Sequence, residues 1–190
     1  MKISEFFGFF FRYLRNPSSV GAVCPSSRFL AREMAAPLCG FVKRGDSVAE
    51  LGAGTGAVSE YLLKVPDLSV DKLYCIEFEK DSAHVLAEKF PEAKVFNDSA
   101  ENIVSIMGAD VKKLKCVVSS LPLLSLPKEC VASILGRCQN ALPSGGMFVQ
   151  FTYNLAHSPA EEYLTQMRRV KTYFVPLNLP PARVDVFIKR

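Results

Sequence analysis

A glycine-rich run near residue 50 carries the clearest chemistry in this sequence. Glu50 is followed, after one leucine, by Gly52-Ala53-Gly54-Thr55-Gly56. Glycines at this spacing let a chain turn tightly and bring its backbone close to a ligand, and a helix that begins after the turn offers unpaired N–H groups to an anion. Gly52, Gly54 and Ala57 also satisfy the G-x-G-x-x-G/A pattern of dinucleotide sites, so the run alone predicts a nucleotide-type cofactor and does not choose which.

Acidic residues at neighbouring strand ends favour S-adenosylmethionine over a nicotinamide cofactor. Glu50 stands two residues before the first glycine, where methyltransferases keep an acid that orients the amino-acid end of this cofactor. Glu77 ends the next predicted strand and can accept both ribose hydroxyls, although a dinucleotide enzyme uses the same position. Asp98 follows the third strand, where a carboxylate beside a backbone N–H can read the adenine edge. A surface acid at Glu77 and an Asx turn or helix cap at Asp98 are the alternatives.

The elements that position these residues alternate between strand and helix. We expect strands at 47–51, 72–77, 93–97, 115–119 and 147–151, with helices beginning near Ala57, Asp81, Ala100 and Pro127. A helix capped by Ser26 or Ser27 precedes them, and another is expected over 159–169. The extended stretches 172–177 and 184–188 are joined too tightly for a parallel crossover, so they form an antiparallel hairpin. The pattern predicts a Rossmann-like, seven-stranded methyltransferase sheet, mostly parallel with an antiparallel C-terminal hairpin.

Composition limits the architecture and the chemistry. With 190 residues we expect one methyltransferase domain over residues 16–190 and an N-terminal arm over residues 1–15. The six cysteines include no Cys-x-x-Cys pair and indicate reduced, buried thiols in the cytoplasm. With only two histidines a zinc site would need an unusual ligand set, so no metal is expected. The net charge of +4 is mild, and its small basic clusters suit an anionic surface or simply solvated loops.

The N-terminal arm is rich in phenylalanine and bordered by arginines. Its membrane-binding candidates are Phe6, Phe7, Phe10, Arg12 and Arg15. The apolar run is too short to span a bilayer, and its charges disfavour a signal peptide. A helix that lies in the membrane interface is one interpretation, and rings that cap the domain's own core are the other.

The loop after the fourth predicted strand argues against a nucleic-acid substrate. Ser119-Ser120-Leu121-Pro122-Leu123 leaves the sheet where ligands bind in open α/β folds. Adenine N6-methyltransferases have a polar-Pro-aromatic sequence here, with a ring that stacks on a flipped base. Leu123 stands in place of that ring, so a ribosomal RNA adenine methyltransferase is only an alternative.

Five segments outside the glycine run resemble the bacterial phospholipid N-methyltransferases, which methylate phosphatidylethanolamine toward phosphatidylcholine. They are Arg12 to Pro17, Val20 to Ser27, Ser120 to Leu123, Gln150 to Tyr153 and Leu177 to Val184. The resemblance covers essentially the whole chain and departs from the family pattern at Ala53, Cys24 and Ser119-Ser120. Ornithine-lipid N-methyltransferases are close relatives, so the headgroup stays open.

The resemblance implies a lipid amine substrate and a peripheral location on the inner face of the cytoplasmic membrane, through the N-terminal arm. Tyr153 is the candidate catalytic residue, by orienting the amine, or else an aromatic packed at a strand end. Asn178 and Arg183 are candidates for contacting the lipid's phosphate or glycerol region. The expected product is S-adenosylhomocysteine, and the cofactor-binding candidates are Ser26, Ser27, Glu50, Gly52, Ala53, Gly54, Glu77, Phe78, Asp98, Ser99, Ser119 and Leu121.

Overall fold

The computed structural model describes residues 27–190, which form one seven-stranded sheet in the order β3-β2-β1-β4-β5-β7-β6. The strands are β1 (Ser47–Leu51), β2 (Leu73–Glu77), β3 (Lys94–Asn97), β4 (Leu114–Ser119), β5 (Met147–Thr152), β6 (Met167–Val175) and β7 (Ala182–Lys189). β1 to β5 pair in parallel, and β7 pairs antiparallel with both β5 and β6. The Rossmann-like methyltransferase sheet with its antiparallel C-terminal hairpin is confirmed.

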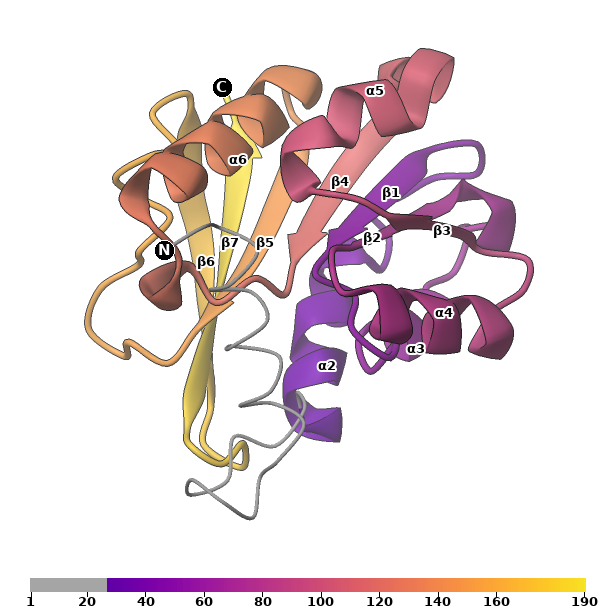
Figure 1. The fold of residues 1–190 in the computed structure, drawn as a ribbon. Coiled ribbons are helices and arrows are strands. Elements are labelled where there is room, and N and C mark those ends of the chain that lie inside the picture. Colours follow the sequence, from indigo (N-terminus) through magenta and orange to yellow (C-terminus); the bar gives the residue numbers. More distant parts are fainter. Residues whose placement is uncertain (1–26) are drawn as a thin grey trace.

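Helices cover both faces of the sheet (Figure 1). One face packs against α2 (Arg28–Ala35), α3 (Ser59–Leu62) and α4 (Lys80–Lys89), and the other against α5 (Ile103–Met107) and α6 (Lys128–Ala141). Each face therefore has its own apolar core, and every residue of β1, β2 and β5 is buried. Strands buried on both faces read as continuous apolar runs, which is why the sequence predicted them to within a few residues.

Short 3₁₀ segments complete the described chain: η1 (Ala36–Leu38), η2 (Val70–Lys72), η3 (Ala100–Asn102), η4 (Gly108–Lys113) and η5 (Leu123–Ser125). Among residues 27–190, no helix is long and apolar enough to cross a membrane. Within the same range, no cluster of three or more His, Cys, Asp or Glu side chains could hold a metal ion. Four of the five described cysteines are buried free thiols, whereas Cys39 is an exposed one.

The helix expected over 159–169 is wrong. Residues 159–163 form turns, and β6 begins at Met167. Gln139 on α6 holds this segment through its side chain, which donates to the Tyr163 carbonyl at 3.3 Å and accepts from the Gln166 N–H at 3.2 Å. These long-range hydrogen bonds satisfy backbone groups that a helix would otherwise pair, so the segment needs no helix.

Helix α2 and the hairpin agree more closely with expectation. The Ser27 hydroxyl accepts from the Leu30 N–H at 3.3 Å and caps α2, as predicted for Ser26 or Ser27. The antiparallel pairing of β6 and β7 is confirmed. The predicted membrane-binding residues of the arm and Ser26 lie outside the described residues.

Gly56 is required by both its backbone conformation and its surroundings. Its φ is +89°, and a Cβ built there would lie 2.6 Å from Phe90 Cε2 and 2.7 Å from Leu86 Cδ1. This lack of a side chain lets the segment after the glycine turn pack against α4. Gly136 in the middle of α6 differs, because a Cβ there would meet nothing within 4 Å.

We expect Gly56→Ala to lower the free energy of unfolding by about 2–4 kcal/mol, through strain at positive φ and overpacking against α4. Gly136→Ala is the matched control and should raise it by about 0.5–1 kcal/mol, because alanine is the better helix former. Chemical denaturation of the two variants measures both effects. Equal stability of the two variants would contradict this account of Gly56.

Candidate functional site

The glycine turn meets the loop after β4 at the carboxyl edge of the parallel strands. Gly52 has a φ of +68°, and a Cβ there would lie 2.8 Å from Leu121 Cδ2. The Ser120 N–H donates to the Leu51 carbonyl at 2.8 Å, which fixes the loop beside β1. The positive φ favours glycine at this position, and any side chain there would also have to displace the Leu121 side chain.

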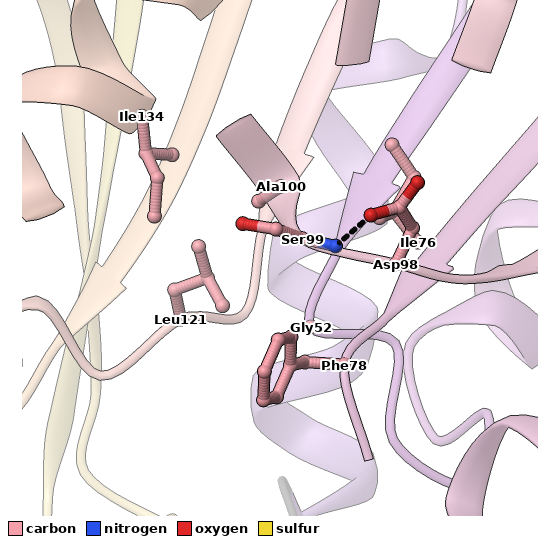
Figure 2. Close-up of a pocket in the computed structure, with 8 residues that line it drawn as sticks. All are labelled: Gly52, Ile76, Phe78, Asp98, Ser99, Ala100, Leu121 and Ile134. Carbon is pink, nitrogen blue, oxygen red and sulfur yellow. Dashed lines mark hydrogen bonds between the residues drawn. The ribbon is translucent and has the colours of Figure 1, made fainter. Parts of the chain in front are cut away.

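A pocket opens next to this contact (Figure 2). It is lined by Gly52, Ile76, Phe78, Asp98, Ser99, Ala100, Leu121 and Ile134. Five of these eight were predicted from the sequence as cofactor-binding residues, and the structure brings them together from the ends of β1 to β4. Ile76, Ala100 and Ile134 were missed. Ile134 comes from α6, and its apolar position predicts only burial, so local sequence gave no signal of its role.

Asp98 and Ser99 form a local turn at one side of the pocket. Asp98 Oδ1 accepts from the Ser99 N–H at 2.7 Å and from Asn102 Nδ2 at 2.9 Å. The Ser99 hydroxyl accepts from the Glu101 N–H at 3.3 Å and caps η3. The backbone N–H expected to read adenine beside Asp98 is thus occupied by Asp98 itself. Both residues still line the pocket, and the cap of η3 is Ser99 rather than Asp98.

The Glu77 carboxylate connects the glycine turn to the end of β2. Its Oε2 accepts from the Gly54 N–H at 2.8 Å, and its Oε1 accepts from the Glu79 N–H at 2.7 Å. Burial raises the pKa of Glu77, while these backbone hydrogen bonds lower it. Each carboxylate oxygen has a further lone pair, so Glu77 can hold the turn and still accept a ribose hydroxyl.

Glu50 is fully buried on the face of the sheet that α3 covers. Its Oε2 accepts from the Ser59 hydroxyl at 2.6 Å and lies 3.7 Å from Cys75 Sγ, whereas Oε1 has no hydrogen-bond partner among the described residues. Burial raises the pKa of Glu50 to about 7, and the charge of Glu77 adds to the rise. An unpaired carboxylate oxygen at this depth would be satisfied by a cation or an N–H donor.

The predicted helix N-terminus at the glycine turn is much weaker than expected. α3 has only four residues and begins at Ser59 rather than near Ala57. The N–H groups of Gly52, Gly54 and Gly56 donate to protein oxygens. The attraction of the cofactor's carboxylate to a helix dipole, expected from the sequence, therefore has little support here. Ala53 lies within the turn and is buried.

Asn178 and Ser27 bind each other rather than standing open to a ligand. Asn178 Oδ1 accepts from the Ser27 N–H at 3.2 Å, and Asn178 Nδ2 donates to the Pro180 carbonyl at 2.7 Å. Asn178 is itself buried, so its described contacts join the β6–β7 turn to the start of α2. Asn178 therefore has a structural role here, and its buried side chain differs from the open lipid-contacting group that was predicted.

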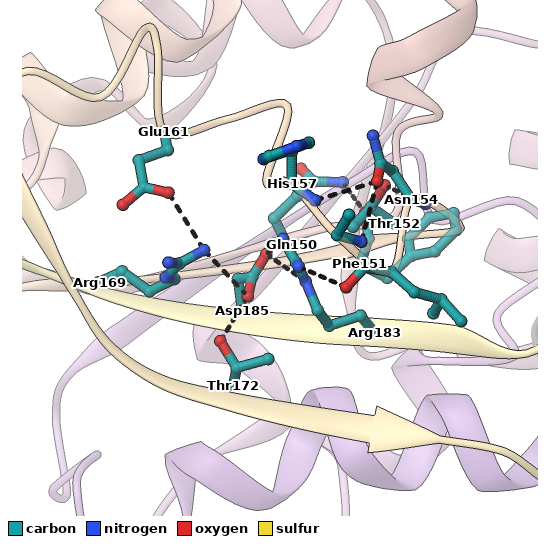
Figure 3. Close-up of polar contacts among 12 residues, drawn as sticks. Gln150, Phe151, Thr152, Asn154, His157, Glu161, Arg169, Thr172, Arg183 and Asp185 are labelled. Atoms are coloured by element: carbon teal, nitrogen blue, oxygen red, sulfur yellow. Dashed lines mark hydrogen bonds and ion pairs between the residues drawn. The ribbon is translucent and has the colours of Figure 1, made fainter.

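Arg183 belongs to a buried ionic network (Figure 3). Its guanidinium donates twice to Asp185 Oδ2, at 3.0 and 3.2 Å, and once to the Leu155 carbonyl at 2.9 Å. Asp185 also accepts from the Thr172 hydroxyl at 2.7 Å, and Arg169 lies 4.0 Å from it. Arg183 therefore fixes the loop after β5 to β7, and its charge is already paired within the protein.

Gln150 connects the loop after β4 to β5. Its Nε2 donates to the Leu121 carbonyl at 2.9 Å and to the Phe151 carbonyl at 2.8 Å. The Ser119 hydroxyl accepts from the Leu121 N–H at 3.4 Å and is buried. Tyr153 follows β5 at the same edge, half-buried, with its ring packed edge-on against Phe151 at 5.4 Å. The ring packing matches the alternative interpretation of Tyr153, an aromatic residue packed at a strand end.

These groups fit S-adenosylmethionine. Glu50 supplies an unsatisfied carboxylate oxygen for a cationic amino-acid end, and Glu77 supplies lone pairs for a ribose. The pocket walls contributed by Ile76, Leu121 and Ile134 are apolar, as an adenine ring requires.

Comparison with known proteins supports the same fold. No protein-family model matches the chain. It is 27% identical to the ornithine lipid N-methyltransferase of Singulisphaera acidiphila, over 95% of this chain and 94% of that protein. It is 33% identical over half of its length to the ribosomal RNA small subunit methyltransferase A of a Hydrogenobaculum species, but the match spans only 32% of that protein.

A solved structure shows the same fold. The 1,6-didemethyltoxoflavin-N1-methyltransferase of Burkholderia thailandensis, with bound 1,6-didemethyltoxoflavin and S-adenosylhomocysteine, superposes with a TM-score of 0.67 at 15% identity, over 100% of this chain and 91% of that one. The strand order, the glycine turn and these comparisons give the chain the fold of the class I S-adenosylmethionine-dependent methyltransferases, whose methyl donor is S-adenosylmethionine and whose product is S-adenosylhomocysteine.

We expect Glu50→Gln to make the cofactor-free protein more stable at pH 8 and to weaken cofactor binding. Because the folded pKa of about 7 lies above the ordinary 4.5, the carboxyl's contribution to stability is fully present below pH 4.5 and is lost as the pH rises through 7. The glutamine stays neutral, so its advantage at pH 8 should be on the order of 3 kcal/mol and should vanish near pH 4.

Thermal unfolding and calorimetry at pH 6 and pH 8 measure the two effects of Glu50→Gln. Cofactor affinity of the unsubstituted protein should rise between these pH values as Glu50 ionises, and affinity of the variant should stay flat. A variant that is less stable at pH 8, or whose affinity keeps the same pH dependence, would contradict the assignment.

Proposed function

We propose that this chain is an S-adenosylmethionine-dependent N-methyltransferase that acts on the primary amine of a membrane lipid. The observation that carries the proposal is the similarity to an ornithine lipid N-methyltransferase over nearly the full length of both chains. Phosphatidylethanolamine and ornithine lipid both present a primary amine at the headgroup. The first is the substrate of the family that the sequence resembles, and the second gives the relative its name, so these two lipids define the substrate class.

The reaction needs positioning more than acid–base chemistry. Bound S-adenosylmethionine supplies a methyl group on a sulfonium, and the lipid nitrogen forms a bond to that carbon while the carbon–sulfur bond breaks. The protein's task is to hold the amine in line and to exclude water from it. The proton that leaves the ammonium before attack can pass to solvent.

Unpaired oxygens at the substrate side of the site support an amine ligand. Gln150 Oε1 and Ser120 Oγ are buried and have no hydrogen-bond partner among the described residues. They lie on adjacent segments, because Gln150 Nε2 donates to the carbonyl of Leu121, the neighbour of Ser120. A primary amine carries N–H donors that both oxygens can accept, and Gln150 Oε1 can only accept, so it favours an amine over a carboxylate or phosphate. We assign the orientation of this amine to Tyr153 at the same edge, with its ring as the contact for the methylated ammonium.

Methylation of ribosomal RNA is the second candidate, favoured by the half-length match to a ribosomal RNA methyltransferase. Recognition of a flipped base needs an aromatic platform after β4, and the chain has Leu123 there, buried in the apolar core. The lipid proposal also accounts for the phenylalanine-rich arm and its predicted attachment to the inner face of the membrane, which the RNA candidate leaves unexplained.

The test is transfer of radiolabelled methyl groups from S-adenosylmethionine by the full chain. Separate reactions contain vesicles with phosphatidylethanolamine, vesicles with ornithine lipid, vesicles of phosphatidylcholine alone, and ribosomal RNA. We expect label in one or both amine lipids and none in phosphatidylcholine or RNA. Label in RNA with unlabelled lipids would replace the proposal by its alternative.

Replacement of Tyr153 by phenylalanine tests the assigned role of its hydroxyl. We expect kcat on the labelled lipid to fall by about 10–100-fold, because the amine loses an orienting hydrogen bond, while cofactor affinity and thermal stability stay near those of the unsubstituted protein. Phe151→Leu is the packing control, since it removes the ring that Tyr153 contacts and keeps the hydroxyl. A Tyr153→Phe variant with full kcat would reduce Tyr153 to a packing residue.

A further inference from the structure

The turn between β6 and β7 presents an apolar tip to solvent. Phe174, Leu177 and Leu179 are 64%, 69% and 72% exposed, and the prolines at 176, 180 and 181 are exposed beside them. We call residues 174–181 the hairpin tip. Single exposed apolar residues are ordinary on protein surfaces, but a run of six apolar exposed positions on one protruding turn is not.

The tip is held in shape from within. Asn178 is buried at its centre and bonds to the Ser27 N–H and to the Pro180 carbonyl. Val175 and Ala182 pair at the base of the turn and are buried with it. The buried residues Val175, Asn178 and Ala182 hold the turn together by themselves. The exposed side chains of Leu177 and Leu179 add little packing to the described fold, so a contact outside it would explain them.

The charged residues within 163–184, the segment that includes the tip, are all positive. No aspartate or glutamate occurs between residues 163 and 184. Arg28 and Arg32 are exposed on α2, whose first residues are joined to the tip by the Ser27–Asn178 hydrogen bond, and Lys171 is exposed on β6. Apolar groups bordered by arginine and lysine match the acyl boundary and the anionic headgroups of a bilayer.

The tip also lies on the same edge as the cofactor pocket. β7 is antiparallel to both β5 and β6, so β6 ends at the edge where β1, β4 and β5 end. Figure 1 shows the hairpin extending beyond those strand ends, past α2. A surface that receives the tip would therefore face the edge that carries Gly52, Leu121 and Tyr153.

We propose that the hairpin tip inserts into the interface of an anionic phospholipid bilayer, with Leu177 and Leu179 among the acyl chains and the surrounding arginines and lysine at the headgroups. This inference deepens the proposed function, because it says how a lipid amine reaches the site, and it assigns a membrane contact separate from the N-terminal arm.

The chain contains no tryptophan, so Leu177→Trp introduces a single fluorescent reporter at the tip. The full-length variant is mixed with vesicles of phosphatidylcholine and phosphatidylglycerol, with or without bromine on the acyl chains. We expect a shift of emission to shorter wavelength and loss of most of the emission with brominated lipid. Val104→Trp on α5 is the matched control, because Val104 is also exposed but belongs to a helix on the face of the sheet opposite α2, and it should show neither change.

Two results would overturn the insertion. Emission of the position-177 reporter that stays at long wavelength with vesicles means that the tip remains in water. Emission that is already shifted in buffer means that protein covers the tip, from a second copy or from residues 1–26, and light scattering separates these two.

A second pair of variants measures the contribution of the leucines. Leu177→Ser combined with Leu179→Ser should weaken vesicle binding by about tenfold or more, since two large side chains lose their burial in lipid. Val85→Ser combined with Val104→Ser removes two exposed valines elsewhere and should leave binding unchanged. Equal vesicle affinity of both double variants would contradict the proposal.

The assays also separate this inference from the proposed function. If the reporter is quenched but neither amine lipid is methylated, the tip contacts the bilayer and the proposed substrate is wrong. If an amine lipid is methylated but the reporter is not quenched, the proposed substrate stands and the tip is not the membrane contact.

Discussion

Two carboxylates are buried on neighbouring strands at the cofactor edge of the sheet. Glu50 near the end of β1 and Glu77 at the end of β2 are both inaccessible to solvent, and each has a raised pKa because burial disfavours its charge. Hydrogen bonds from Ser59, Gly54 and Glu79 offset part of that cost, but Glu50 Oε1 is left unpaired. A cationic ligand lowers this cost, so the cofactor-free fold holds a strain that binding relieves.

The sequence predicted the sheet well because its strands are buried on both faces. Apolar runs and turn residues located every strand, and the short link before β7 fixed its antiparallel direction. Two helical predictions were poorer for a common reason. The Gln139 side chain on α6 holds the segment 159–166, where a helix was expected. The helix expected near Ala57 is only the four residues of α3. In both places the local sequence pattern predicted more helix than the folded chain forms.

The sequence predicted many of the residues that line the pocket, but it did not predict which polar side chains bind one another. Residues at strand ends, such as Gly52 and Asp98, reach the pocket because the carboxyl ends of parallel strands share one edge. Asn178 and Arg183 were predicted to contact the lipid's phosphate or glycerol region, yet their described bonds go to Ser27, Asp185 and other protein groups. Sequence position identifies the edge of the sheet, but it does not reveal which polar groups bind one another.

An enzyme that modifies a lipid headgroup must meet its substrate at a definite height above the bilayer. The polar headgroup layer on each side of the hydrocarbon core is only about 5–8 Å thick, so the reactive nitrogen occupies a thin zone. A rigid turn that enters the acyl boundary by about 5–10 Å fixes the distance between that zone and the protein edge above it. The buried Asn178 bonds give the β6–β7 turn that rigidity, and the antiparallel strands connect it directly to β5 and Tyr153. Depth of insertion and access of the amine would then be set by one element of the fold.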